Sequence, residues 1–291
     1  MKNIITILIL LLCFSCNTND NADAYGNFES TETTVSSKQV GEIVFAENCK
    51  GKTINKSDIL FIIDTVNLDL QKEKLIAQQK LTQAKINEIN AEITIIRTEK
   101  ETVLREYKRL ENLLKDGAVT KQNFDTIKDK IKIIEAKIKA LNTKKVSINK
   151  NINVIQKSID IVNKQLKDCF VKSPIKGTII EQYVEIGELV SPGKPLFKVA
   201  NIKQMKLKAY ISGNRISSLK IGQKVQVKID KNNKDFYTYE GKIIYISNKA
   251  EFTPKIIQTK EERVNLVYAF EVLVKNDGKI KIGMPGEVRF K

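Results

Sequence analysis

The side chains that most often carry out chemistry in proteins are scarce in this sequence of 291 residues. It contains no His, so it lacks both the commonest general base and the commonest transition-metal ligand. We find in it no nucleophile paired with a base, no metal-binding cluster and no phosphate-binding loop. The residue types therefore predict a protein that is not an enzyme and that needs neither a cofactor nor a metal.

The residue whose context does indicate a chemical modification is Cys16. It follows a short positive start, an apolar run at 4–14 that is too short to span a bilayer, and the small residue Ser15. Polar residues come directly after it. This pattern resembles a lipoprotein signal, in which the Cys becomes the lipid-modified first residue; an ordinary cleaved signal is the alternative. We expect lipid attachment at Cys16 and a periplasmic protein of the cell envelope, anchored to the inner membrane.

Export also decides how the charge and the other cysteines are interpreted. The formal net charge of +16 would favour nucleic acid or an anionic membrane as a partner. An exported protein does not meet the genome, so we expect no nucleic-acid partner. Cys49 and Cys169 can pair in an oxidising compartment, but two free, partly buried thiols are favoured because the chain has no dense cysteine framework.

An internal repeat predicts the first structural element that could position functional residues. Segments 35–64 and 171–200 align without a gap, and each has short β-branched runs bounded by turn residues. The identical pairs are Val35/Val171, Ser37/Ser173, Gly41/Gly177, Gly51/Gly187, Leu60/Leu196 and Phe61/Phe197. One copy is too small to bury a face, so two copies should close into a quasi-twofold β-sandwich. The pattern resembles the two halves of a biotinyl/lipoyl-type domain, but an insertion occupies the junction where carrier proteins hold their modified Lys.

That insertion, 66–168, has no Pro and a single Gly, Gly117, almost at its midpoint. Two seams with alternating spacings of three and four predict an antiparallel coiled-coil hairpin with arms of roughly 70 Å. Thr120 can cap the returning helix. A dimerising coiled coil with an unrelated break at Gly117 is the alternative. The seam of the first arm is Leu68, Lys72, Leu75, Gln79, Thr82, Ile86, Ile89, Ile93, Ile96, Lys100, Val103, Tyr107, Leu110 and Leu114. The seam of the second arm is Phe124, Ile127, Ile131, Ile134, Ile138, Leu141, Lys145, Ile148, Ile152, Ile155, Ile159, Val162 and Leu166.

The segment 201–291 alternates short strands with turns, which predicts a small antiparallel β-barrel. The expected strands are 205–211, 223–229, 240–246, 267–274 and 286–290, with 28–34 as a further edge strand. The segment carries 19 Lys and Arg against 9 Asp and Glu. This excess suits an anionic bilayer or an acidic face of a transporter. Equally, Lys on solvent faces and edge strands blocks unwanted strand addition.

Taken together, these features resemble the HlyD-like periplasmic adaptors, also called membrane fusion proteins. Residues 171–177, 187–190 and 193–197 are similar to the most recognisable stretch of that family. Residues 251–263 and 283–286 are similar to the subgroup associated with ABC exporters. The resemblance implies an α+β fold in which a lipoyl-like β-sandwich is split by the hairpin and followed by the barrel. Its expected parts are a signal peptide at 1–15, a lipidated linker at 16–34, sandwich halves at 35–65 and 169–200, the hairpin at 66–168 and the barrel at 201–291.

The resemblance also implies a site at the hairpin tip. Many adaptors that dock onto TolC-like channels carry there an Arg, a Leu four positions on and a Ser seven further. This chain has Arg109, Leu113 and Thr120 at that spacing. In a docking role the Leu packs between channel helices, while Arg and the hydroxyl bind backbone at the end of the channel. Simple packing for Leu113 and capping for Thr120 are the alternatives.

The function expected from the resemblance is that of a periplasmic adaptor in a tripartite efflux or secretion system. Its partners would be an inner-membrane ABC transporter, an outer-membrane channel and further copies of itself in a hexameric ring. The alternative is a structural lipoprotein that spans the periplasm without a pump.

Overall fold

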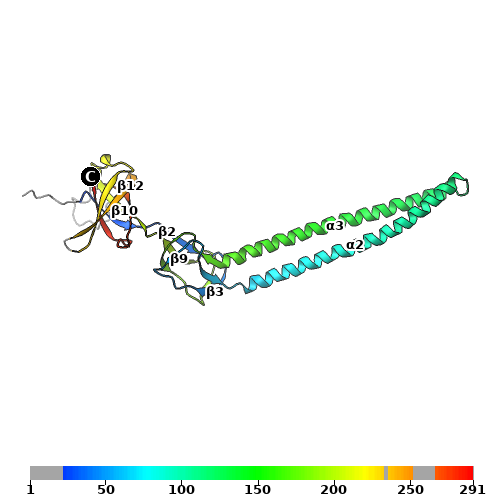
Figure 1. Ribbon diagram of the computed structural model, residues 1–291, viewed down its shortest axis with the longest axis horizontal. Helices are drawn as coiled ribbons and strands as arrows, with labels where there is room; N and C mark the ends of the chain where they lie inside the picture. The colour runs from blue at the N-terminus through cyan, green and yellow to red at the C-terminus, as the bar shows by residue number, and fades with distance from the viewer. Residues whose placement is uncertain (1–21, 233–234, 252–265, 291) are drawn as a thin grey trace, which may run out of the picture.

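The computed structural model describes residues 22–232, 235–251 and 266–290. Figure 1 shows three parts along one long axis, with a barrel at one end, a sandwich next to it and a helical hairpin extending away from the sandwich. The predicted α+β architecture is therefore confirmed.

The sandwich consists of two four-stranded sheets, ordered β2-β9-β7-β4 and β6-β5-β3-β8. Each strand of the first half has its counterpart 136 residues later in the second half. Replacing every strand of one sheet by its counterpart gives the other sheet, so the two sheets are equivalent. Each sheet contains two strands from each half, and neither half can form its sheets alone. The strands are β2 (Glu32–Ser36), β3 (Gly41–Ala46), β4 (Thr53–Ile54), β5 (Ile59–Ile63), β6 (Phe170–Lys172), β7 (Gly177–Gln182), β8 (Leu189–Val190) and β9 (Pro195–Ala200).

The core between the two sheets is built around one aromatic pair. Phe61 on β5 and Phe197 on β9 occupy the same position of the repeat, and both are fully buried. Their rings are stacked, with centroids 5.8 Å apart. Cys49 and Cys169 lie in the same core as free, buried thiols, and burial raises the pKa of both.

The hairpin begins and ends on neighbouring strands. Helix α2 (Val66–Lys115) starts just after β5, and α3 (Lys121–Cys169) continues directly into β6. Because β5 pairs with β6, with Phe61 opposite Val171, the two stems leave the sandwich side by side. Every predicted seam position of both arms is buried or half-buried. The two arms pair with each other within one chain. This excludes the alternative in which Gly117 merely interrupts a dimerising coiled coil.

Three polar positions of the seam, Lys100, Lys145 and Gln79, are paired across the two arms. The Lys100 ammonium is 2.7 Å from the Glu135 carboxylate, and Lys145 donates to the Asn90 side chain at 2.9 Å. Gln79 donates to Gln156 at 3.0 Å. Polar residues in a coiled-coil seam cost stability but specify the register, because a shifted register would leave them without partners.

The barrel is closed, in the order β1-β10-β13-β12-β11-β14. Its strands are β1 (Ala24–Glu29), β10 (Gln204–Ser212), β11 (Lys224–Asp230), β12 (Phe236–Glu251), β13 (Val267–Lys275) and β14 (Pro285–Phe290), with a short helix η2 (Ile216–Ser218) between β10 and β11. The expected edge strand at 28–34 was wrong in its bounds and its role. Its residues are divided between β1 and β2, and β1 pairs on both sides, with β10 and β14, so it closes the barrel.

Asp23 fastens the chain where it enters the barrel. Its backbone N–H donates to the Val288 carbonyl at 2.9 Å, and its carboxylate accepts from the Phe290 N–H at 2.8 Å and from the Arg215 side chain. Burial acts to raise the pKa of Asp23, but these hydrogen bonds and the charge of Arg215 outweigh it and lower that pKa. The carboxylate therefore stays charged and holds β1 against β14.

Candidate functional site

The turn at the hairpin tip is built from a left-handed glycine and a helix cap. Gly117 has φ 69°, and the Ala118 N–H donates to the Leu113 carbonyl at 2.8 Å. Only glycine adopts this conformation without strain. The Thr120 hydroxyl oxygen then accepts from the Asn123 N–H at 3.3 Å, which confirms Thr120 as the cap of α3. An aromatic pair that the sequence analysis missed lies below the turn, where the rings of Tyr107 and Phe124 are 5.0 Å apart.

The three residues predicted for the site all lie near this turn. The Arg109 side chain is 69% exposed and forms an ion pair with Glu106 at 2.7 Å. Exposed pairs one turn apart contribute little to stability, so a partner can replace Glu106 at small cost. Leu113 is half-buried, and it lies one helical turn beyond Arg109 on the same side of α2. The Thr120 hydroxyl uses one acceptor position for the cap and keeps its proton for donation.

A feature that the sequence analysis did not identify lies along the arms. Five of the exposed large apolar side chains on the two arms share a heptad position. Each lies one position before a seam residue, and these five seam residues all occupy the same position of the heptad. Within each arm, the five side chains are therefore a multiple of seven residues apart. They are Leu81, Ile95, Ile133, Val154 and Ile161. The two arms of an antiparallel hairpin are related by a twofold axis perpendicular to the plane that contains both helices. Residues at the same heptad position of the two arms therefore lie on the same side of that plane. We call this the apolar face of the hairpin. Arg109 occupies the same heptad position nearer the tip.

Several sequence predictions lie outside the described residues. These are Cys16 with its signal and most of the 251–263 segment. Within the described residues, no helix combines the length and apolar character needed to cross a membrane. In the same residues, no group of three or more Cys, Asp and Glu side chains is placed to hold a metal ion.

Comparisons with known proteins match both the barrel and the whole architecture. The family described as "LcnD-like, C-terminal domain" matches residues 201–289. A "UPF0194 membrane protein" of Yersinia pseudotuberculosis serotype O:3 (strain YPIII) is 32% identical over 126 residues, which cover 43% of this chain and 38% of that protein. The chain thus matches well under half the length of this relative.

Two solved structures show the same fold. The crystal structure of MacA from Actinobacillus actinomycetemcomitans is similar with a TM-score of 0.58 and 24% identity, over 91% of this chain and 76% of that one. The membrane fusion protein Spr0693 of Streptococcus pneumoniae R6 is similar with a TM-score of 0.54 and 14% identity, over 92% and 98% of the two chains. The chain therefore has the fold of these membrane fusion proteins. The resemblance to the HlyD-like periplasmic adaptors that the sequence predicts is confirmed.

Proposed function

We propose that this protein is the periplasmic adaptor of a tripartite efflux or secretion system. It would connect an inner-membrane transporter of the ABC type to a TolC-like outer-membrane channel and would make or break no covalent bond. The observation that carries this proposal is the exposed tip with Arg109, Leu113 and Thr120, held far from the barrel by a stiff pair of helices. Arms of 50 and 49 residues extend about 75 Å at 1.5 Å per residue.

The proposed lipid on Cys16 suits this arrangement. Asp23, seven positions further on, is fastened to the barrel at the end away from the sandwich. Seven extended residues span at most about 25 Å, so a lipid on Cys16 would hold the barrel close to the inner membrane. The hairpin leaves the opposite side of the sandwich and would then point away from that membrane.

The apolar face supports self-association of the hairpins in a ring of copies, which we propose to be hexameric. Exposed apolar residues with a heptad repeat suit packing against another long helix. We expect Val154→Lys to weaken self-association about tenfold, because the buried position of one Val in an interface contributes about 1.5 kcal/mol or more. Val146→Lys, on the other broad face and similarly exposed, serves as the matched control. Analytical ultracentrifugation of both variants measures this, and equal losses would rule out the apolar face as the interface.

The docking proposal is tested by placing Cys at the tip. In cells that produce the Thr120→Cys variant, a short thiol-specific crosslinker should capture an outer-membrane channel. The same experiment with Cys at Lys56, an exposed residue of the sandwich far from the tip, should capture no channel. If the tip captures only other copies of this chain, or nothing, while deletion of the gene leaves export intact, the structural lipoprotein without a pump replaces the adaptor.

A further inference from the structure

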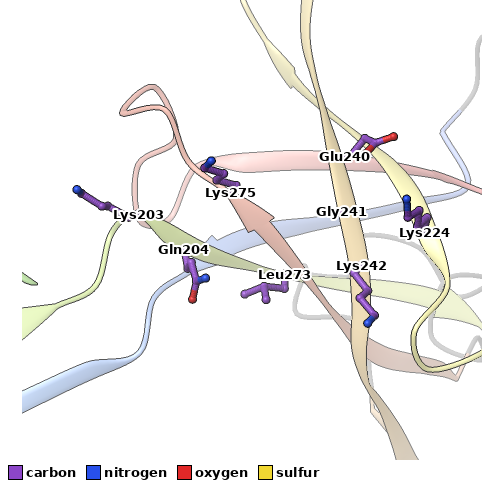
Figure 2. A pocket seen from close by; sticks show the side chains of 8 residues that line it. All are labelled: Lys203, Gln204, Lys224, Glu240, Gly241, Lys242, Leu273 and Lys275. Carbon is purple, nitrogen blue, oxygen red and sulfur yellow. The ribbon is translucent and has the colours of Figure 1, made fainter.

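A basic depression lies on the outer wall of the barrel, at the end nearest the sandwich. Figure 2 shows Lys203, Lys224, Lys242 and Lys275 around it. Its volume is about 410 Å³, and Leu273 is the one large apolar residue in its lining. Gly241 lines the depression with its backbone, and the aliphatic stems of the lysines add apolar surface while their ammonium groups remain in water.

This depression continues toward the sandwich. A second cavity of about 800 Å³ between barrel and sandwich is also lined by Lys203, Gln204 and Lys275, and it adds Lys176 from the sandwich. We call the two together the lysine groove. It is lined by five lysines and by two acids, Glu240 and Asp277, which leaves an excess of three positive charges.

The strand register makes this concentration of charge costly. Lys224 on β11 lies directly opposite Lys242 on β12. Side chains in such a cross-strand pair have Cβ atoms about 5 Å apart, and like charges there destabilise the sheet. A sheet that carries this pair is stabilised by any anion bound between the two ammonium groups.

Other lysines of the barrel are neutralised within the fold. Lys206 pairs with Glu271 at 3.2 Å, and Lys208 pairs with Glu251 at 3.6 Å. By contrast, the five groove lysines make no ion pair with the part of the chain that the structure describes. Their charge is therefore available to a ligand.

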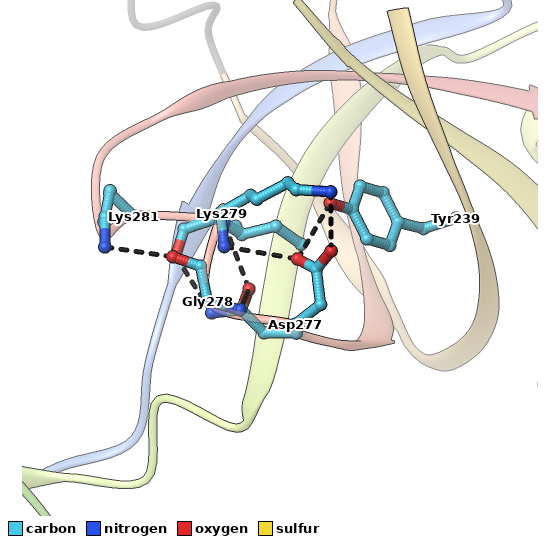
Figure 3. Close-up of polar contacts among 7 residues, drawn as sticks. Tyr239, Asp277, Gly278, Lys279 and Lys281 are labelled. Carbon is cyan, nitrogen blue, oxygen red and sulfur yellow. Dashed lines mark hydrogen bonds and ion pairs between the residues drawn. The ribbon is translucent and has the colours of Figure 1, made fainter. Parts of the chain in front are cut away.

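The acid at the sandwich end of the groove is already engaged. Asp277 pairs with Lys279 at 3.1 Å and accepts from the Tyr239 hydroxyl at 3.1 Å, and Lys281 donates to the Gly278 carbonyl at 3.0 Å (Figure 3). Burial, together with this hydrogen bond, raises the pKa of Tyr239 to about 12, so its hydroxyl remains a donor. Asp277 thus holds the β13–β14 turn in place and does not neutralise the groove lysines.

We propose that the lysine groove binds an acidic polypeptide segment of a partner protein. The lining contains lysines from both domains and no Arg, and Lys acts as a mobile point charge that suits carboxylates spread along a chain. A bilayer is disfavoured as the occupant by position. The proposed lipid anchor comes before Asp23 and Ala24, which lie at the end of β1 away from the sandwich. The groove lies at the opposite end of the barrel, where β10 begins at Gln204. This proposal is independent of docking at the hairpin tip.

The test measures binding of a fluorescent peptide of ten glutamates to the full chain by anisotropy, at low and at physiological salt. The groove variant carries Lys203→Gln, Lys224→Gln, Lys242→Gln and Lys275→Gln. Its matched control carries the same change at four exposed hairpin lysines, Lys74, Lys80, Lys108 and Lys130. We expect at least a tenfold loss of affinity for the groove variant and less than twofold for the control.

Three outcomes would overturn the proposal. These are equal losses in the two variants, no binding to the native protein, or groove-dependent binding only to vesicles containing phosphatidylglycerol and not to the peptide. The single variant Lys242→Gln distinguishes a loss of binding from misfolding. Removing the like-charge pair should raise the thermal midpoint of this variant, while its affinity for the peptide falls.

Discussion

Replacing Phe197 by Ala is expected to lower the free energy of unfolding of the sandwich by about 3–5 kcal/mol. Phe197 is fully buried and stacks on Phe61 across the two sheets. The substitution removes most of this contact and leaves a cavity that the opposing sheet cannot close. Since folded domains are stable by only about 5–15 kcal/mol, the loss is a large part of the total. Urea unfolding followed by circular dichroism measures it.

The effect should extend to the hairpin, because both stems leave from β5 and β6 of the same sandwich. Phe45→Ala is the matched control, since Phe45 lies on β3 of the same sandwich but is 43% exposed. We expect it to cost about 0.5 kcal/mol or less. Similar losses for the two Phe variants would contradict the assignment of the aromatic pair as the centre of the core.

The second large effect is expected at the tip, where Arg109→Ala should reduce export and crosslinking of Thr120→Cys to the channel about tenfold or more. An Arg that binds carboxylates or backbone carbonyls at a desolvated interface contributes about 2 kcal/mol or more. Within the protein, Arg109 makes only an exposed pair with Glu106, so its removal should leave the fold unchanged. Helical content and thermal midpoint check this.

Arg105→Ala provides the control for Arg109. Arg105 is also exposed on α2, and its guanidinium donates to the Thr102 hydroxyl at 3.1 Å. It lies one helical turn before Arg109 on the same side of α2 and farther from the tip, so it tests whether the position of the charge matters. We expect the Arg105 variant to keep export and crosslinking within twofold of the native protein. Equal effects of both substitutions would indicate a general charge requirement, and no effect of either would remove Arg109 from the docking site.

The parts of the fold that depend on local pattern were predictable from the sequence. The hairpin is one of them, because a repeat of three and four positions decides which side of a helix is buried whatever surrounds it. Every seam position from Leu68 to Leu166 follows this pattern in the structure. The cap at Thr120 and the strands of the barrel are similarly local, since each depends on a few neighbouring residues. The sandwich was also detectable, because its two halves have similar sequences.

Tertiary structure alone decided which distant strands become neighbours. The exchange of strands between the two halves, and the place of β1 as the strand that closes the barrel, depend on pairing between residues far apart in sequence. The same holds for the lysine groove. Lys224 and Lys242 are unremarkable among the 50 basic residues until the register of β11 and β12 sets them opposite each other. Local periodicity determines which face of an element is buried, but the register between elements is set by the packing of the whole core.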